Sequence, residues 1–344
     1  MKHTKNELAQ MQSLPLNIKI QMTKRRIREW YEFWEGQVYI SFSGGKDSTV
    51  LLHMVRELYP DVEAVFVNTG LEYPEIQKFV KTFDNVTILR PEMRFDEVIK
   101  KYGYPIISKD VSQTIHYARQ NSAWAWKRLN GIDCRRDVPS EYRKQRYGKW
   151  KPLAETDFKC SNWCCLIMKE RPFYEVEKVK KPIIGILAEE SERRKDAWIK
   201  TGCNAFDSNK PVSKPMSFWT GQDVLQYIRD FKIPIASVYG DVIFAEEPDQ
   251  TRIEFYDGLP CGKLCTTGCN RTGCMFCAFG AHLEKGETRF QRLKRTHPKQ
   301  YAYCIGGGAY DEDGIWNPNK DGLGMGHVFD ELNKIYGEDF IRYK

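Results

Sequence analysis

A glycine-rich turn with the sequence "SGGKDST" contains the residues whose types and spacing most clearly predict chemistry. It follows an apolar stretch at 38–42 and opens a segment with helical periodicity. Backbone N–H groups at a helix start bind anions, helped by the positive end of the helix dipole. Gly44 and Gly45 let the backbone approach an anion closely, and Lys46 adds a positive charge. We therefore predict a phosphate-binding loop made of Ser43, Gly44, Gly45, Lys46, Asp47, Ser48 and Thr49.

The residue after the lysine distinguishes this loop from the common nucleotide-binding loop G-x-x-x-x-G-K-[ST]. Here Asp47 follows Lys46, so the spacing does not fit that motif. A plain strand-to-helix turn needs at most one glycine and no lysine. Lys46 could neutralise a leaving pyrophosphate, and Asp47 could ligate a Mg²⁺ ion that bridges it. The resemblance of this loop to the PP-loop of ATP-cleaving enzymes implies ATP and Mg²⁺ as cofactors, with Lys46 and Asp47 as catalytic residues.

Eleven cysteines form the second chemical signal, and most of them lie in two groups. Soft thiolates at short spacing bind zinc or an iron–sulfur cluster. The isolated Cys134, Cys203 and Cys304 are expected to be small buried hydrophobic residues. The candidates for metal binding are Cys160, Cys164 and Cys165 in one group, and Cys261, Cys265, Cys269, Cys274 and Cys277 in the other.

Short apolar runs alternate with helical patterns through the first half of the chain. The expected strands are 38–42, 62–70, 85–91 and 181–191, and the expected helices 47–59, 73–83 and 95–103. This alternation predicts a doubly wound parallel α/β sheet. Asn68, Thr69 and Gly70 follow the second strand, at the carboxyl edge where such sheets bind nucleotides.

The composition of the sequence changes at about residue 203, after which proline, glycine, cysteine and aromatic residues are frequent. One clear helix is expected at 217–231, where Thr220 and Asp223 fit a capping box. We predict two regions: a nucleotide-binding α/β domain with an N-terminal helix at 1–205, and a smaller cysteine-rich C-terminal unit at 206–344.

Composition limits the partners. The net charge of +7 favours anionic partners, and no apolar run approaches the roughly 20 residues that span a membrane. We expect a cytoplasmic protein without a membrane partner.

Segment 135–151 carries seven Lys and Arg residues interspersed with Tyr142, Tyr147 and Trp150. Cations can follow a nucleic-acid backbone while rings stack on bases, but a solvated basic surface is an equally good interpretation.

Three motifs carry a resemblance to known families. "SGGKDS" resembles the PP-loop of the adenine nucleotide alpha-hydrolase-like superfamily, which implies ATP cleavage between the α and β phosphates. The stretch 185–195, "GILAEESERRK", is similar to G-x-R-x-x-E-S-x-x-R of the phosphoadenosine phosphosulfate (PAPS) reductase family, and 214–240 resembles a further segment of that family. Leu187 replaces the arginine of G-x-R, so Arg193 or Arg194 would supply that contact. The resemblance implies nucleotide contacts by Glu190, Ser191, Asn68, Thr69 and Gly70, and a catalytic Arg194.

A resemblance also bears on the cysteines. "CC-x-x-x-K-x-x-P" followed by "C-x-x-C" resembles the [4Fe-4S] signature of adenosine phosphosulfate reductases, with Cys164, Cys165, Cys274 and Cys277 as ligands. A second resemblance, to the ATP pyrophosphatase of DNA phosphorothioate modification, favours a local C-terminal set in which Cys269 is the strongest third ligand. Both sets stay open, and a 4Fe-4S cluster is preferred over zinc. The candidate metal ligands are Cys164, Cys165, Cys269, Cys274 and Cys277.

These observations favour a transferase of sulfur metabolism. Sulfonucleotide reductases usually lack the Lys-Asp pair and carry a cysteine-containing C-terminal tail, whereas this sequence ends "YGEDFIRYK". We expect an ATP pyrophosphatase that supports iron–sulfur-dependent sulfur transfer, with nucleic acid as acceptor, a donor such as a cysteine desulfurase, and a possible homo-oligomer. The alternatives are an APS/PAPS reductase, an ATP sulfurylase-like enzyme, and a non-catalytic cluster-bearing nucleic-acid-binding subunit.

Overall fold

The computed structural model describes residues 3–245, 255–256, 259–260 and 262–344. The chain forms two compact units, each assembled from separate segments. Unit 1 contains 1–68, 72–89 and 173–272, and unit 2 contains 69–71, 90–172 and 273–344. The predicted division into 1–205 and 206–344 differs from this arrangement, because the chain leaves unit 1 after residue 89 and re-enters it at 173. A change in composition does not report such a crossing.

Unit 1 is built on a six-stranded sheet in the order β3-β2-β1-β5-β7-β6. Its strands are parallel except β6, which is antiparallel to β7. Of the four longer strands, β1, β2 and β5 are mostly buried apolar runs, as parallel sheets require, whereas β3 lies at the edge with Thr87 and Ile88 exposed. The predicted parallel α/β class and its four strands are therefore confirmed. The bounds are β1 Val38–Ser41, β2 Ala64–Val67, β3 Val86–Leu89, β5 Lys181–Ile184, β6 Asn204–Ala205 and β7 Val212–Ser213.

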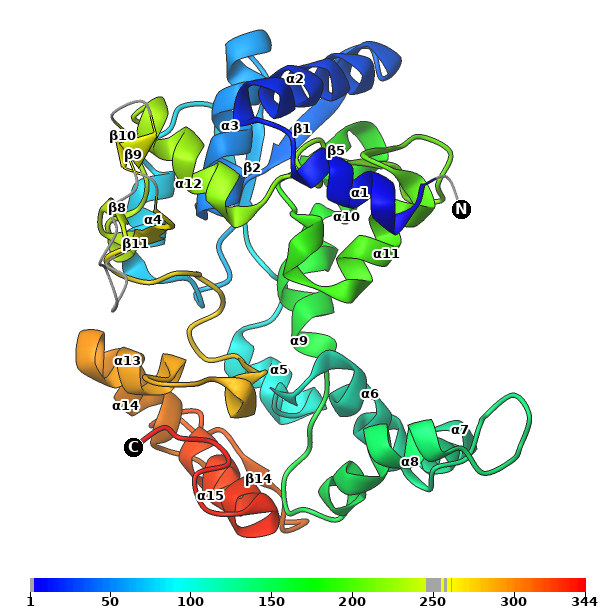
Figure 1. The fold of residues 1–344 in the computed structure, drawn as a ribbon. Helices are drawn as coiled ribbons and strands as arrows, with labels where there is room; N and C mark the ends of the chain where they lie inside the picture. Colours follow the sequence, from blue (N-terminus) through cyan, green and yellow to red (C-terminus); the bar gives the residue numbers. More distant parts are fainter. Residues whose placement is uncertain (1–2, 246–254, 257–258, 261) are drawn as a thin grey trace. The chain divides into compact units, whose positions relative to one another are not determined.

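The helices of unit 1 form where the sequence has apolar periodicity; Figure 1 labels α1, α2, α3, α4, α10, α11 and α12. In α3, the buried Val50, Leu51 and Met54 recur at helical spacing, and the helix packs against α12, α2 and β1. The capping box at Thr220 and Asp223 is present at the start of α12. The bounds are α1 Lys5–Gln12, α2 Leu16–Phe33, α3 Lys46–Leu58, α4 Pro74–Val80, α10 Tyr174–Val179, α11 Glu192–Thr201 and α12 Gly221–Asp230.

Short elements complete unit 1. The 3₁₀ turn η4 Ala188–Glu190 lies between β5 and α11. After α12 come the 3₁₀ turn η5 Ser237–Tyr239, the antiparallel pair β8 Val242–Phe244 and β11 Leu264–Thr266, and the antiparallel pair β9 Phe255–Tyr256 and β10 Leu259–Pro260. From the cysteine-rich sequence we predicted that the region after residue 205 belongs to a separate C-terminal unit. Instead, residues up to 272 belong to the unit that carries the sheet.

Unit 2 is mainly helical and contains the predicted helix at 95–103 as α5. A short parallel pair, β4 with β12, joins its two longer chain segments through Ile106 with Ala278 and Ile107 with Phe279. Its elements are α5 Phe95–Tyr102, β4 Ile106–Ile107, α6 Lys109–Ala118, α7 Ala123–Leu129, α8 Glu141–Tyr147, η1 Gly148–Ala154, α9 Trp163–Cys165, the π-helical turn η2 Leu166–Glu170, the boundary turn η3 Arg171–Phe173, β12 Ala278–Phe279, η6 Ala281–Leu283, α13 Arg289–Thr296, α14 Pro298–Ile305, β13 Ala309–Tyr310, β14 Trp316–Asn317 and α15 Met325–Tyr336.

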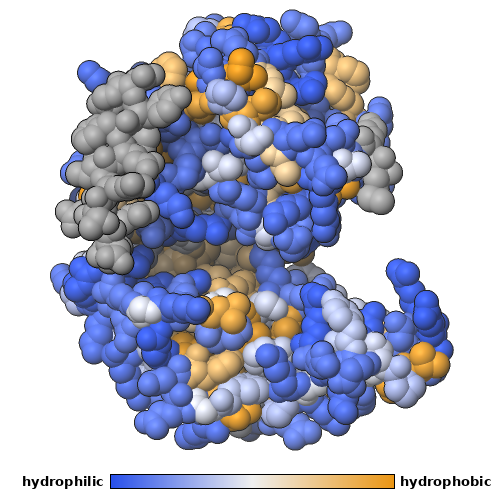
Figure 2. All heavy atoms as spheres, viewed as in Figure 1, coloured by the Kyte–Doolittle hydropathy of each residue, from blue (hydrophilic) through white to orange (hydrophobic). Residues whose placement is uncertain are grey.

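The visible surface of each unit is mostly hydrophilic, with smaller hydrophobic patches between the polar side chains (Figure 2). Among the described helices, none has the length and apolar character that a membrane span requires.

Candidate nucleotide-binding site

The glycine-rich turn lies between β1 and α3, as predicted. Gly44 has a φ of +69°, a left-handed conformation that favours glycine. A Cβ on Gly44 would also lie 2.8 Å from Cγ2 of Ile76 and 2.9 Å from Cγ2 of Val80. Gly45 is the N-cap of α3, so the helix starts at Lys46 and Asp47 lies in its first turn. The first backbone N–H groups of α3 are therefore at the position that binds anions.

Hydroxyl groups inside the turn hold it in shape. Ser43 and Ser48 hydroxyls lie 3.0 Å apart, and the backbone N–H of Ser43 donates to Oγ of Ser48 at 3.2 Å. Ser48 and Thr49 each donate their hydroxyl to the carbonyl oxygen of Gly45 at 2.9 Å. Thr49 is buried and does not line the cavity described next. The nucleotide contact predicted for Thr49 stays a prediction.

The end of β5 approaches the turn so closely that only glycine fits. A Cβ on Gly185 would lie 2.9 Å from the carbonyl oxygen of Asp47 and 3.1 Å from Cα of Ser48. Both neighbours are backbone atoms, so no side-chain rotation would relieve the contact. Gly185 thus lets β5 support the first turn of α3 directly.

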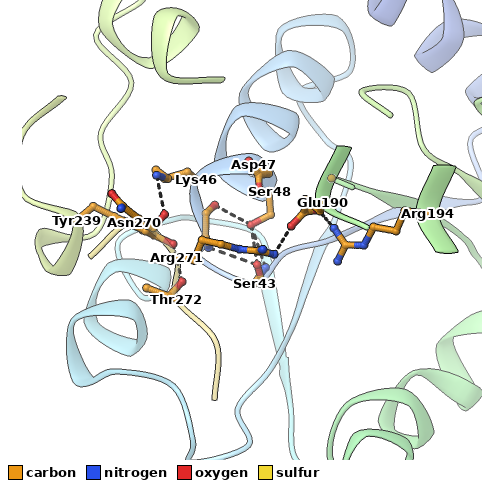
Figure 3. A pocket seen from close by; sticks show the side chains of 12 residues that line it. Ser43, Lys46, Asp47, Ser48, Glu190, Arg194, Tyr239, Asn270, Arg271 and Thr272 are labelled. Carbon is orange, nitrogen blue, oxygen red and sulfur yellow. Dashed lines mark hydrogen bonds and ion pairs between the residues drawn. The ribbon is translucent and has the colours of Figure 1, made fainter. Parts of the chain in front are cut away.

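A polar cavity of about 190 Å³ opens beside this turn (Figure 3). Lys46 donates from Nζ to the carbonyl oxygen of Asn270 at 2.9 Å and lies 5.1 Å from the ring centre of Tyr239. Glu190 forms ion pairs with Arg194 and with Arg271. The lining residues are Ser43, Gly45, Lys46, Asp47, Ser48, Gly185, Glu190, Arg194, Tyr239, Asn270, Arg271 and Thr272.

Burial dominates the electrostatics of the cavity. It lowers the pKa of Lys46, although Asp47 and Cys269 act in the opposite direction. It raises the pKa of Asp47 despite the nearby positive charges of Lys46, Arg271 and Arg194. Charges in such a partly dehydrated site interact more strongly than in water. A bound polyanion would therefore gain from Lys46 and the arginines, and a divalent cation would stabilise the Asp47 carboxylate.

The other predicted nucleotide contacts take different places. Of the two candidate arginines, Arg194 lines the cavity and Arg193 is exposed outside it. Ser191 is the N-cap of α11 and accepts a hydrogen bond from the N–H of Arg194. Asn68 is the last residue of its segment of unit 1, whereas Thr69 and Gly70 belong to unit 2. The nucleotide contacts predicted for Ser191, Asn68, Thr69 and Gly70 stay predictions.

Sequence reasoning missed one side of the cavity. Tyr239, Asn270, Arg271 and Thr272 line it, but none of them was predicted as a site residue. The hydroxyl groups of Tyr239 and Thr272 lie 2.5 Å apart, which joins two segments separated by more than thirty residues. The basic and hydroxyl residues of "CNRTGC" were a usable signal, but the flanking cysteines directed the interpretation toward metal binding.

The cysteine pair of α9 lies in unit 2 together with Cys274 and Cys277. Pairing of β12 with β4 holds the second pair, because β12 begins directly after Cys277. A bridge between Tyr104 and Cys160 holds the segment that leads to α9. Both pairs of the signature that resembles adenosine phosphosulfate reductases thus belong to one unit.

The thiols of this group interact electrostatically. A hydrogen bond between Cys164 and Cys165 raises the pKa of Cys164 and lowers that of Cys165, where Lys109 and Lys169 also favour the thiolate. Cys274 and Cys277 add to the raised pKa of Cys164. Within the described ranges, no three His, Cys, Asp or Glu residues are arranged to hold one metal ion. A four-iron cluster is larger than an ion and needs more widely spaced thiolates, so this finding bears on zinc more than on a cluster.

The rival local set is distributed differently. Cys269 belongs to unit 1, where its thiol donates to the carbonyl oxygen of Arg271 at 2.9 Å. Cys265 lies in β11 of the same unit, and Cys261 lies outside the described residues. Cys203 and Cys304 are buried as predicted, but Cys134 is only partly buried because it lies in a surface loop.

The basic segment 135–151 lies on α8 and its flanking turns in unit 2. Tyr142 is 63% exposed, but Tyr147 and Trp150 are 3% and 4% exposed. Trp150 packs edge-on against Tyr336, with ring centres 5.1 Å apart. The prediction that all three rings can stack on bases is therefore wrong for Tyr147 and Trp150, because these rings form part of the core of unit 2.

Comparison with known proteins identifies the family. Residues 37–120 and 131–279 match the phosphoadenosine phosphosulfate reductase domain, and these ranges include the glycine-rich turn, Glu190, Arg194 and the two cysteine pairs Cys164–Cys165 and Cys274–Cys277. The chain belongs to the phosphoadenosine phosphosulfate reductase family. It is therefore a nucleotide-binding PP-loop protein. The resemblance to the phosphorothioate enzyme stays a prediction.

The relatives of this PAPS reductase family member include proteins named adenosine 5'-phosphosulfate reductase. It is 24% identical over 211 residues to an adenosine 5'-phosphosulfate reductase of Bacillus cereus, covering 59% of this chain and 68% of the relative. An uncharacterized protein of Methanocaldococcus jannaschii is 26% identical over 300 residues, covering 84% of this chain; the chain spans about half of that relative's length, 53%. A PAPS reductase structure from Candida auris aligns with a TM-score of 0.36 at 14% identity, over 69% of this chain and 91% of that one.

Proposed function

We propose that this family member binds ATP with Mg²⁺ and cleaves it between the α and β phosphates, activating an acceptor oxygen for replacement by sulfur. The observation that carries this proposal is the pair Lys46 and Asp47 in the first turn of α3, on a cavity shared with Arg194. In the proposed step the acceptor oxygen attacks the α phosphorus, and the bond to the bridging oxygen breaks. Lys46 and Arg194 would stabilise the charge that develops on the leaving pyrophosphate.

The donor set of the cavity fits a magnesium ion. Mg²⁺ prefers carboxylate, hydroxyl and phosphate oxygens. Asp47 and Ser48 would hold it, since the other carboxylate of the cavity, Glu190, is ion-paired with two arginines. When bound, the ion would neutralise charge on the phosphates.

The two cysteine pairs of unit 2 support an iron–sulfur cluster as a second cofactor. Cys164, Cys165, Cys274 and Cys277 would supply four thiolates, the number that a 4Fe-4S cluster takes. The lowered pKa of Cys165 favours the thiolate form that ligates metal. When bound, the cluster would supply redox or sulfur-transfer chemistry.

For the acceptor we propose a nucleic acid, with sulfur from a donor such as a cysteine desulfurase. Support comes from the cations around α8, where Arg143, Lys144, Arg146 and the exposed Tyr142 lie close in sequence. Basic residues bind a phosphate backbone regardless of sequence. The buried Tyr147 and Trp150 leave Tyr142 as the stacking ring of this segment.

The test is a pair of product assays on anaerobically purified protein. Pyrophosphate release from ATP is measured beside sulfite release from adenosine phosphosulfate and its 3'-phosphate. We expect pyrophosphate, and its rate should rise when the correct nucleic acid is added. If Lys46→Ala releases pyrophosphate as fast as the wild-type protein does, this loop does not catalyse the reaction.

The second candidate is a sulfonucleotide reductase. Two observations favour it: the adenosine 5'-phosphosulfate reductases among the relatives, and the presence of both cysteine pairs in unit 2. Sulfite release without pyrophosphate would establish this candidate and overturn the leading proposal. Sulfate-dependent pyrophosphate release from ATP would indicate an ATP sulfurylase-like enzyme, and binding of nucleic acid with neither product would indicate a binding subunit.

A further inference from the structure

The loop after β11 reaches the phosphate-binding turn along a path fixed by backbone hydrogen bonds. The N–H groups of Gly268 and Cys269 donate to the carbonyl oxygens of Tyr239 and Val238 at 2.9 and 3.0 Å. A Cβ on Gly268 would lie 2.5 Å from the carbonyl oxygen of Val238. The loop can therefore lie against η5 only because residue 268 is glycine.

The same loop is held on the side of the phosphate-binding turn. Lys46 donates to the carbonyl oxygen of Asn270, and the hydroxyl of Thr272 bonds to that of Tyr239. Arg271 lies between these two attachments, at the cavity (Figure 3). Its backbone is thus fixed on both sides, although its side chain is 71% exposed to solvent.

Glu190 connects Arg271 to the arginine that the family motif predicts. Oε2 of Glu190 pairs with Nη1 of Arg194, and Oε1 pairs with Nη2 of Arg271. The Glu190 side chain is only 14% exposed, so its carboxylate is largely withdrawn from water. A buried carboxylate needs such partners to offset the cost of its dehydration. One carboxylate therefore holds two guanidinium groups from distant segments beside one cavity.

The charges of the cavity leave room for an anionic ligand. Lys46, Arg194 and Arg271 supply three positive charges, and Asp47 and Glu190 supply two negative ones. A guanidinium has five N–H donors in a planar fork, so an arginine that pairs with a carboxylate keeps further donors for phosphate oxygens. Arg271 also approaches the cavity from the segment opposite α11, so two arginines could contact one diphosphate from different sides.

We infer that Arg271 is a second phosphate-binding arginine, which contacts the β,γ-diphosphate of the nucleotide, and that Glu190 positions Arg271 and Arg194 for this contact. This inference rests on the proposed function, in which a pyrophosphate group occupies the cavity. It adds a binding residue from outside the motifs and gives Glu190 an indirect role.

The experiment is calorimetric titration of the full chain with pyrophosphate, ATP and AMP. Arg271→Gln should weaken pyrophosphate and ATP binding about tenfold, or about 1.4 kcal/mol, and change AMP binding less than about twofold. Arg271→Lys keeps the charge without the fork, so it should lie between wild type and Arg271→Gln. Arg193→Gln is the matched control: it removes the same charge from an exposed position outside the cavity and should bind like wild type.

Glu190→Gln separates positioning from simple charge. Removing a negative charge from the cavity would by itself strengthen anion binding. If Glu190 positions the two arginines, the substitution should instead weaken pyrophosphate binding about fivefold. Tighter binding would overturn the positioning role, and circular dichroism with the melting temperature shows whether each variant is folded.

The outcomes distinguish a failure of the inference about Arg271 from a failure of the proposed function. If Arg271→Gln binds pyrophosphate as tightly as the wild-type protein does, Arg271 is not a phosphate-binding residue, and the proposed function is unaffected. A wild-type protein that binds adenosine phosphosulfate but neither ATP nor pyrophosphate would overturn both.

Discussion

The contact between Gly185 and the first turn of α3 allows a direct test of how the sheet positions the phosphate-binding turn. In Gly185→Ala, the new Cβ would lie 2.9 Å from the carbonyl oxygen of Asp47 and 3.1 Å from Cα of Ser48. Ordinary contacts are longer by several tenths of an ångström, and both neighbours are backbone. The end of β5 and the turn must therefore move apart.

The expected cost follows from this displacement. Overpacking of this kind costs about 1–3 kcal/mol, which lowers the melting temperature by about 2–4 °C per kcal/mol in a unit of this size. We expect the substitution to reduce activity more strongly than it reduces stability. A shift of the donors around the phosphates should reduce kcat/KM for pyrophosphate release by roughly tenfold, because catalytic groups tolerate little displacement.

The assay compares Gly185→Ala with Gly148→Ala, in which the nearest atoms to the new Cβ are 3.8 Å away. Thermal unfolding and pyrophosphate release are measured for both. The control should match wild type in both measurements. If Gly185→Ala also matched wild type, β5 would not hold the turn in place. A lower melting temperature with unchanged kcat/KM would show that the strain is relieved away from the site.

Three further predictions concern single side chains. Lys46→Gln should reduce pyrophosphate release at least a hundredfold with little change in the melting temperature; retention of activity would exclude the lysine from the chemistry. Cys165→Ser should lose iron and acid-labile sulfide after anaerobic purification, whereas Cys265→Ser should retain both; the reverse result would favour the local ligand set. Partial burial alone would raise the pKa of Asp110, but the hydrogen bond from Tyr147 and the charges of Arg128 and Arg146 lower it. Because the folded pKa is the lower one, this carboxylate stabilises the protein above the unfolded pKa near 4 and loses that effect as pH falls through the folded pKa. Asp110→Asn should therefore cost about 1 kcal/mol in urea unfolding at pH 7, discounted for partial exposure, and progressively less below about pH 4; a cost independent of pH would contradict this account.

Much of the fold could be predicted because its signals are local. The apolar runs at 38–42 and 62–70 form β1 and β2, and the helical period after Lys46 forms α3. The division into units could not be predicted in the same way. Residues 90–172 leave the sheet unit and pair with residues after 272, and such long-range pairing leaves no mark in local composition.

The residues of the candidate site likewise fall into those that local sequence predicts and those that it does not. Ser43 to Asp47 act through a turn whose conformation depends on a few adjacent residues, above all Gly44, so the motif predicted their position. Arg271 lies 224 residues or more from that turn and was not predicted. It reaches the cavity only because Gly268 lets its loop pack against η5.

The sequence by itself therefore determined the parallel sheet, the glycine-rich turn that opens α3 with Lys46 and Asp47, and the cysteine pairs as candidate ligands. Only the tertiary structure decided that Arg194 rather than Arg193 lines the cavity, that Arg271 shares Glu190 with it, and that Cys269 lies in a different unit from Cys274. The physical reason is range: propensity, periodicity and turn chemistry act over a few residues, whereas the composition of a site depends on which distant segments pack together.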